Sequence, residues 1–148
     1  MQIQTDPLDT QKIDLDITVE AQVKSTESKD KVAKAITNLF PRPGDLRFEH
    51  DRIVLVFSDL EGLQFLKDQF RDRRVRSAAR RLLIANQDEG SLQTFLLLNK
   101  QAATAGIGSL CDDPKESALG PMVLRIRSSH LPRMIDWMTQ GYDAAERS

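Results

Sequence analysis

The sequence is poor in cysteine and aromatic residues, and it has no long hydrophobic run. Only one of its 148 residues is cysteine, Cys111, which excludes an internal disulfide framework and a multi-cysteine zinc site. No stretch approaches the roughly 20 apolar residues of a membrane-spanning helix, and the polar, acidic start does not resemble a signal peptide. Aromatic residues make up 5% of the chain and form no row on which single-stranded RNA could stack. We therefore expect a protein of the reducing cytoplasm that does not contact a membrane.

Neither sign of charge is in excess. The chain has 21 basic and 22 acidic residues, a formal net charge of −1, and 40% hydrophobic residues. This composition excludes a disordered chain and a uniformly basic nucleic-acid binder. A length of 148 residues fits one domain whose core needs no disulfide or metal. Residues 1–11 are polar and without periodicity, so we expect a flexible tail there and a single α+β domain over residues 12–148.

Hydrophobic periodicity predicts the fold class. Residues 13–24 alternate between apolar and polar side chains, which is typical of a long strand with one solvated face. Helical spacing predicts four helices, which lie between Thr26 and Pro41, after Ser58, from about Asp72 to Asn86 and after Ser129. The candidate N-terminal caps are Ser25 or Thr26 for the first helix, Ser58 for the second and Ser129 for the last. Further strands are expected at residues 46–49, 53–57, 92–99 and 122–127. The order β-α-β-β-α-α-β-loop-β-α predicts an α+β fold, with a mixed or antiparallel sheet and helices on one face.

The most unusual segment, residues 71–81, contains six arginines and one aspartate and carries a local charge of +5. At about 100° per residue, Arg73, Arg76 and Arg80 fall within about 60° of one another on a helix, and Arg74 and Arg81 adjoin them. Planar, permanently charged guanidinium groups suit phosphate oxygens and stack on exposed bases. The alternative is a solvated helix face whose arginines pair with acidic neighbours.

Two strands carry charge on their solvated faces. Arg125 and Arg127 form a second basic feature on the last predicted strand, although protection of an edge strand from aggregation explains them equally well. On the first strand, Asp14, Asp16 and Glu20 make the exposed face acidic, so we expect phosphates to avoid it.

The segment 99–109 combines small residues and glycines with the polar residues Asn99, Lys100 and Gln101. We consider these three as nucleic-acid contacts, with Lys100 expected to be the most functional and Asn99 the most structural. The segment lacks the Gly-Lys-Ser/Thr of a phosphate loop, and Gly106-Ile-Gly108 does not continue into a dinucleotide-binding fingerprint. A tight crossover with a helical turn is the structural alternative.

No catalytic constellation emerges from the sequence. His50 and His130 lack the i, i+4 histidine partner of a helical zinc site. Asp112-Asp113 is typical of a solvated turn, and Cys111 has no recognisable activating context. We therefore expect no enzyme activity, no metal and no cofactor.

Several segments, in order along residues 13–140, resemble a small family of uncharacterised archaeal proteins. They include Lys24-Ser-Thr-Glu27, Ala35-Ile-Thr-Asn-Leu-Phe-Pro41, Arg73-Arg-Val-Arg-Ser-Ala-Ala-Arg-Arg-Leu-Leu83, Leu98-Asn-Lys-Gln-Ala-Ala103 and Ser117-Ala-Leu-Gly-Pro121. That family is usually labelled RNA-binding-like, and the resemblance implies a fold like that of the large-subunit ribosomal protein that binds 5S ribosomal RNA. Ile107 departs from the pattern, since a lysine is expected there, and this removes one basic group from the loop.

Together these features favour a non-catalytic protein that binds structured RNA, ribosomal or otherwise stable, through phosphate contacts of the arginine-rich helix. The alternative is a protein–protein interaction or assembly module, such as a homodimer, that uses the arginine ridge or the acidic sheet face.

Overall fold

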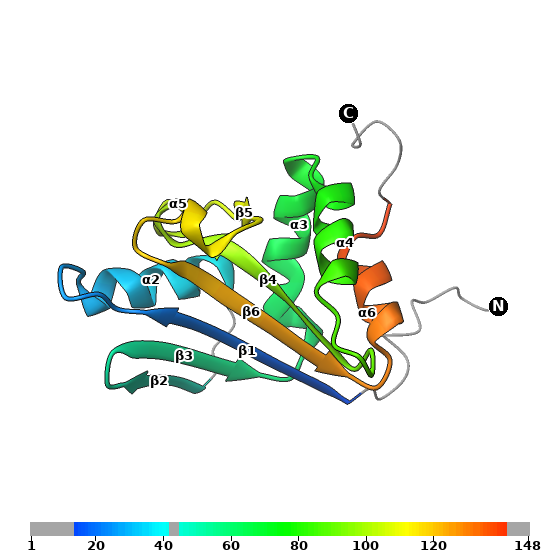
Figure 1. Ribbon diagram of the computed structural model, residues 1–148, viewed down its shortest axis with the longest axis horizontal. Helices are drawn as coiled ribbons and strands as arrows, with labels where there is room; N and C mark the ends of the chain where they lie inside the picture. Colours follow the sequence, from blue (N-terminus) through cyan, green and yellow to red (C-terminus); the bar gives the residue numbers. More distant parts are fainter. Residues whose placement is uncertain (1–13, 42–44, 142–148) are drawn as a thin grey trace.

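The alternating segment forms strand β1, Leu15–Gln22, and its alternation decides which face of the sheet is buried. Ile17 and Val19 are fully buried, whereas Asp16, Thr18 and Glu20, which alternate with them, reach solvent. The computed structural model describes residues 14–41 and 45–141 (Figure 1). The tail predicted at residues 1–11 and both ends of the domain predicted over 12–148 lie outside the described residues.

Six strands form one sheet in the order β2-β3-β1-β6-β4-β5. The strands that join β1 are β2 (Asp45–Glu49), β3 (Arg52–Phe57), β4 (Gln93–Asn99), β5 (Leu110–Cys111) and β6 (Pro121–Ser128). Every pairing within the described part of the chain is antiparallel. Ile17 lies opposite both Phe57 and Ile126, so the central strands present one apolar face.

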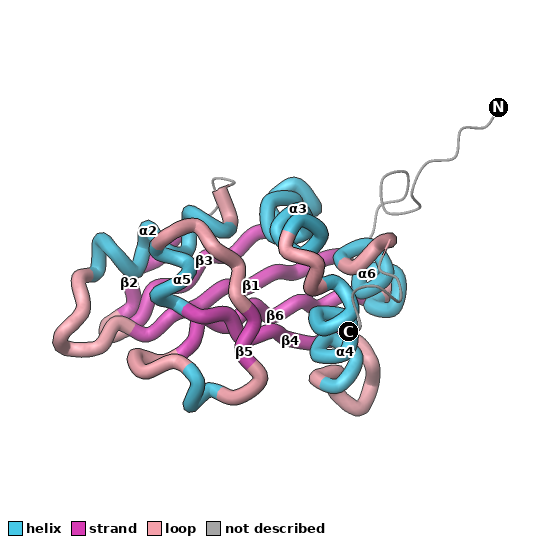
Figure 2. The backbone as a smooth tube through the Cα atoms, turned by 90° about the horizontal axis from the view of Figure 1, so that it is seen from above, coloured by secondary structure: helices cyan, strands magenta, loops and turns pink. Residues whose placement is uncertain are grey.

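The helices cover that apolar face (Figures 1 and 2). They are α2 (Lys29–Leu39), α3 (Gln64–Asp72), α4 (Arg76–Ala85), α5 (Lys100–Thr104) and α6 (Leu131–Met138), with short 3-10 turns η1 (Leu60–Leu63) and η2 (Pro114–Glu116). Ile36 and Leu39 of α2 are fully buried in the same core as Val19. The predicted α+β class, with helices on one face of the sheet, is thus confirmed and the sheet is antiparallel. None of the helices in residues 14–41 and 45–141 is long and apolar enough to cross a membrane.

The predicted helix caps are wrong by one to three residues. Ser28 caps α2 by accepting a hydrogen bond from Lys31 N at 3.3 Å, because residues 24–27 first form a turn that leaves β1. Asp59 rather than Ser58 caps η1, accepting from Gly62 N at 3.0 Å. Several polar residues stand near these two starts, and the turn geometry decides which one caps the helix. Helix α6 begins after His130 rather than Ser129 and has no side-chain cap.

The open face of the sheet is charge-paired rather than acidic. Glu20 is paired with Arg52 at 2.9 Å and also with Arg125, while Asp16 is paired with Arg127 at 3.2 Å. The predicted acidic face is therefore wrong, because strands β3 and β6 bring arginines beside the carboxylates of β1. Strand β6 lies between β1 and β4, so its arginines do not protect a sheet edge.

Candidate nucleic-acid interface

The arginine-rich segment forms a corner between two helices instead of one continuous helix. Helix α3 ends at Asp72 and α4 begins at Arg76. Between them Arg74 has a φ of 59°, in the left-handed region. Arg74 N donates to Arg71 O at 3.1 Å and Val75 N donates to Phe70 O at 2.9 Å, the two bonds of a Schellman helix ending. The helix predicted from Asp72 is wrong at its start, because the left-handed residue turns the chain.

We call Arg73, Arg74, Arg76, Arg80 and Arg81 the arginine corner. Their predicted alignment on one helix face is wrong, because Arg73 precedes α4. Val75 packs against the core, and α4 buries Ala79, Leu82 and Leu83. The apolar side of the segment is therefore buried as predicted.

Three guanidinium groups of the arginine corner are tied to other elements. Arg73 Nη1 donates to Gly108 O at 2.9 Å, and Arg76 Nη1 donates to Gln140 O at 3.1 Å. Arg80 Nη1 lies 2.7 Å from Asp136 Oδ1 on α6 and 3.4 Å from Thr139 Oγ1. These contacts fix α4 against α6, and they fix the turn between α3 and α4 against the loop after α5, so part of the cluster is structural.

The other two arginines of the corner are exposed to solvent. Arg81 Nη2 lies 3.8 Å from Asp112 Oδ1, and both side chains are more than 60% exposed, so the pairing is worth little. Within the described part of the chain, the Arg74 side chain makes no hydrogen bond or ion pair, and Arg73 has no carboxylate partner. Residues 73–85 contain five arginines and no acidic residue. The corner is thus a local concentration of positive charge on a chain whose net charge is −1.

The loop 105–109 connects the two segments that the sequence singles out. It follows α5, and Gly108 near its end has no room for a side chain, because a Cβ there would lie 2.7 Å from Leu66 Cδ1. Gly108 N donates to Gln69 Oε1 at 2.9 Å, while its carbonyl accepts from Arg73. Glycine therefore allows this loop to approach α3 closely and to hold the Arg73 guanidinium in place.

Asn99, Lys100 and Gln101 occupy the start of α5, and each has a different environment. Asn99 caps the helix, its side chain accepting from Ala102 N at 2.8 Å, which agrees with its expected structural role. Lys100 is only 2% exposed, and its ammonium donates to Gln22 O, Glu27 Oε1 and Leu119 O at 2.7–2.8 Å. An ammonium with three acceptors has no donor left for a phosphate. Lys100 is thus placed in the interior, contrary to the functional role expected for it, whereas Gln101 is exposed.

The described residues offer no metal-binding group and no activated thiol. No cluster of three or more histidine, cysteine, aspartate or glutamate residues in ranges 14–41 and 45–141 could hold a metal ion. Cys111 is buried, and its burial, followed by the nearby charges of Glu116 and Asp112, raises its pKa. A thiol of raised pKa is mostly protonated near neutral pH and is a poor nucleophile.

Comparison with known proteins supplies the family. A family model described as RNA binding matches residues 16–128, which span the sheet, the arginine corner and α5. The chain belongs to this family. A UPF0201 protein of Sulfurisphaera tokodaii is 37% identical over 126 residues, covering 83% of this chain and 86% of the relative. Another, from Methanothermobacter thermautotrophicus, is 32% identical over 131 residues, covering 88% of this chain and 95% of the relative.

Solved structures of the family share the fold. The crystal structure of a UPF0201 protein from Methanococcus jannaschii has a TM-score of 0.73 and 27% identity, covering 87% of this chain and 96% of that one. The predicted resemblance to the archaeal RNA-binding-like family is therefore confirmed.

What sequence reasoning missed is the conformation of Arg74 and the contact of Arg73 with Gly108. The run of arginines gave no sign of a helix break, because no glycine or proline interrupts residues 71–81. The glycine at position 108 was visible, but the segment it approaches could only be found in the folded chain.

Proposed function

We propose that this protein binds structured RNA, without catalysing a reaction, through phosphate contacts made by the arginine corner. Membership of a family described as RNA binding supports an RNA partner. We further propose that it does so in the cytoplasm, where its single cysteine stays reduced.

The observation that carries the proposal is Arg74. A left-handed backbone costs an L-residue roughly 1–2 kcal/mol, and this position in a Schellman ending is usually glycine. Arg74 keeps a long cationic side chain there, exposed and without a partner in the described part of the chain. A residue in a strained conformation whose side chain makes no stabilising contact supports a role in binding.

Arg73 adds a positioned charge next to it. Its bond to the Gly108 carbonyl uses one of five N–H donors and leaves the positive charge uncompensated by any carboxylate of the described chain. A guanidinium already held in place loses less rotamer entropy when it meets a phosphate. Arg81, whose one carboxylate contact is long and exposed, can exchange that contact for a phosphate oxygen.

The test is a comparison of Arg74→Gly and the double variant Arg74→Gly/Arg81→Gln with the wild-type protein on a stem–loop RNA. Each lost phosphate contact is expected to flatten the slope of log affinity against log salt by about 0.7–0.9. Arg74→Gly should also leave the free energy of unfolding unchanged or raise it by up to about 1 kcal/mol, because glycine adopts the left-handed region freely. Weaker binding by a protein of equal or greater stability cannot be attributed to misfolding.

Arg125→Gln provides the matched control. Arg125 is also an exposed arginine, but it is paired with Glu20 on the open sheet face. We expect its replacement to leave RNA affinity and its salt dependence unchanged. Unchanged affinity of the double variant, with a wild-type circular dichroism spectrum, would contradict the proposal. The corner would then be assigned to a protein partner.

A further inference from the structure

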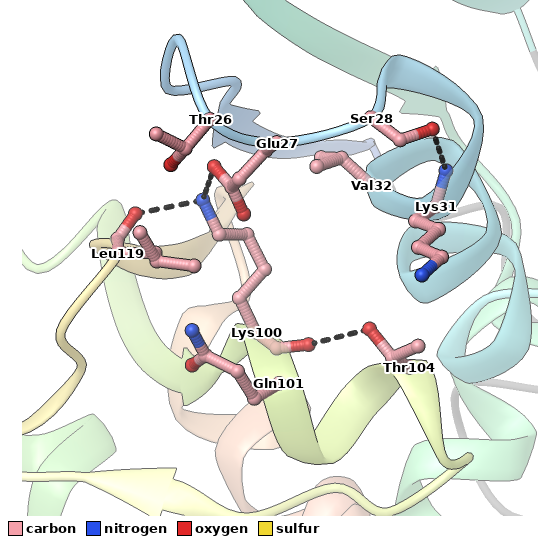
Figure 3. A pocket seen from close by; sticks show the side chains of 9 residues that line it. All are labelled: Thr26, Glu27, Ser28, Lys31, Val32, Lys100, Gln101, Thr104 and Leu119. Atoms are coloured by element: carbon pink, nitrogen blue, oxygen red, sulfur yellow. Dashed lines mark hydrogen bonds and ion pairs between the residues drawn. The ribbon is translucent and has the colours of Figure 1, made fainter.

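A cavity of about 300 Å³ opens beside the amino end of α2 (Figure 3), and no residue of the arginine corner lines it. Its walls come from the turn before α2, from α2 itself, from α5 and from the turn before β6. The volume lies at the lower end of the range for small-molecule sites, about 300–1,000 Å³.

The floor of the cavity is rigid because Lys100 holds three segments together. Its ammonium donates to Gln22 O at the end of β1, to Glu27 before α2 and to Leu119 before β6. Glu27 Oε1 also accepts from Lys24 N at 2.9 Å. The one carboxylate in the cavity wall is thus neutralised by Lys100 and already used as an acceptor.

The remaining polar groups of the wall are mainly hydrogen-bond donors. Figure 3 shows Lys31 reaching from α2 toward α5, across the cavity from Thr26 and Leu119. In the described part of the chain no carboxylate pairs with the Lys31 ammonium. The side chain of Gln101 is exposed, and its amide NH₂ donates no hydrogen bond within the described part of the chain, so it is left to donate to a ligand. The wall therefore offers a net positive charge and amide and hydroxyl donors, which suit a ligand rich in acceptor oxygens.

Two apolar side chains complete the wall. Val32 is buried and Leu119 is half-buried, and both line the cavity. They provide a surface for a sugar or base that a bare anion would not need. The donors and the apolar wall together fit a nucleotide that carries a phosphate group.

We infer that this cavity binds a phosphorylated nucleotide and that Lys31 and Gln101 contact its phosphate. The second part of the inference is that, in the proposed RNA-binding function, this nucleotide is the phosphorylated end of an RNA. The second part of this inference rests on the proposed function. Helix α5 contributes Lys100, Gln101 and Thr104 to the cavity, and the loop that follows α5 holds Arg73 of the arginine corner through Gly108 O.

The experiment measures binding of the full chain to two RNA hairpins that differ only in a 5′-phosphate or a 5′-hydroxyl. We expect the phosphorylated hairpin to bind about tenfold more tightly, the equivalent of one charge-assisted hydrogen bond at about 1.4 kcal/mol per tenfold. Lys31→Gln should remove this preference and leave affinity for the hydroxyl hairpin nearly unchanged. Lys34→Gln, which changes an exposed lysine on the same helix outside the cavity, should keep the preference.

Adenosine 5′-monophosphate, followed by amide chemical shifts, tests the free nucleotide as the source of the phosphate. Changes in the amide chemical shifts of residues 31 and 101 that are absent in the Lys31→Gln variant would support phosphate recognition in the cavity. This holds even if the two hairpins bind with equal affinity, because the free nucleotide is then the ligand. Equal binding of both hairpins together with no shift at these residues would overturn the inference, as would a preference that survives in Lys31→Gln. Neither result affects binding of the hydroxyl hairpin through the arginine corner, so the two proposals fail separately.

Discussion

At the scale of single residues, Lys100 shows how a basic side chain can serve stability. It is 2% exposed and forms an ion pair with Glu27, whose side chain is 11% exposed. Bringing two charges into the interior is costly, and here the cost is offset by the mutual pairing and by two carbonyl acceptors.

Replacing Lys100 with methionine is expected to lower the free energy of unfolding by about 3–5 kcal/mol, because a buried carboxylate and two carbonyls lose their donor. Urea denaturation monitored by circular dichroism measures this loss. Gln101→Ala, the exposed neighbour, should change stability by no more than about 0.5 kcal/mol. A Lys100→Met protein as stable as the wild type would show that water satisfies these groups.

At the scale of elements, β1 is the strand whose pattern is most regular and whose prediction is most direct. Val19 is fully buried and Thr18 is half-buried on the open face. Val19→Ala removes two methyl groups from the core and should cost about 1–3 kcal/mol. Thr18→Ala should cost within about 0.5 kcal/mol. Equal costs in chemical denaturation would mean that the open face is covered in solution.

The loop 105–109 allows a gain-of-function test beside the arginine corner. Ile107 is 40% exposed and adjoins Gly108, whose carbonyl holds Arg73. Ile107→Lys adds a basic group where the family pattern leads us to expect one. We predict tighter RNA binding at low salt, with the salt slope steeper by about 0.7–0.9.

Ile107→Gln is the control for this substitution, because it removes the exposed apolar group without adding charge. It should bind RNA as the wild type does. A lysine variant with no change in affinity would show that RNA does not pass over this loop.

At the scale of the whole molecule, charge is arranged differently on the two faces of the sheet. On the open face Glu20 and Asp16 are paired with arginines of neighbouring strands. On the helix-covered side, residues 73–85 hold five arginines without an acidic residue. This asymmetry leaves the sheet face close to neutral, and under the proposed function RNA approaches from the helix side.

Glu20→Lys tests which face binds the partner. The substitution breaks two ion pairs and should cost about 1 kcal/mol of stability or less, since exposed pairs are weak. RNA affinity, measured by fluorescence anisotropy, should be unchanged or slightly higher because the added charge is positive. Loss of affinity for a second protein, or of self-association, would make the sheet face an interface and favour the interaction-module alternative.

Much of the fold could be predicted because the decisive signals are local. Alternation of apolar and polar residues identified β1 and its buried face, and helical spacing identified α2 and α6. The strand-like segments at residues 46–49 and 53–57 identified β2 and β3. The two-residue strand β5 was missed, since Leu110–Cys111 is too short to show a period and exists only through pairing with β4. The likeness to the ribosomal protein that binds 5S ribosomal RNA stays a prediction.

The sequence by itself determined which residues are apolar, at what spacing, and where arginine accumulates, and these fix the α+β class and the basic segment. Only the tertiary structure decided what each charged group meets. It buried Lys100 against Glu27, 73 residues away, paired Glu20 with Arg125 across strands, and held Arg73 against Gly108. Burial of apolar side chains follows a short-range period that a sequence displays directly. The partner of a charge depends on which distant segments the fold brings within a few ångströms, and no local pattern encodes that distance.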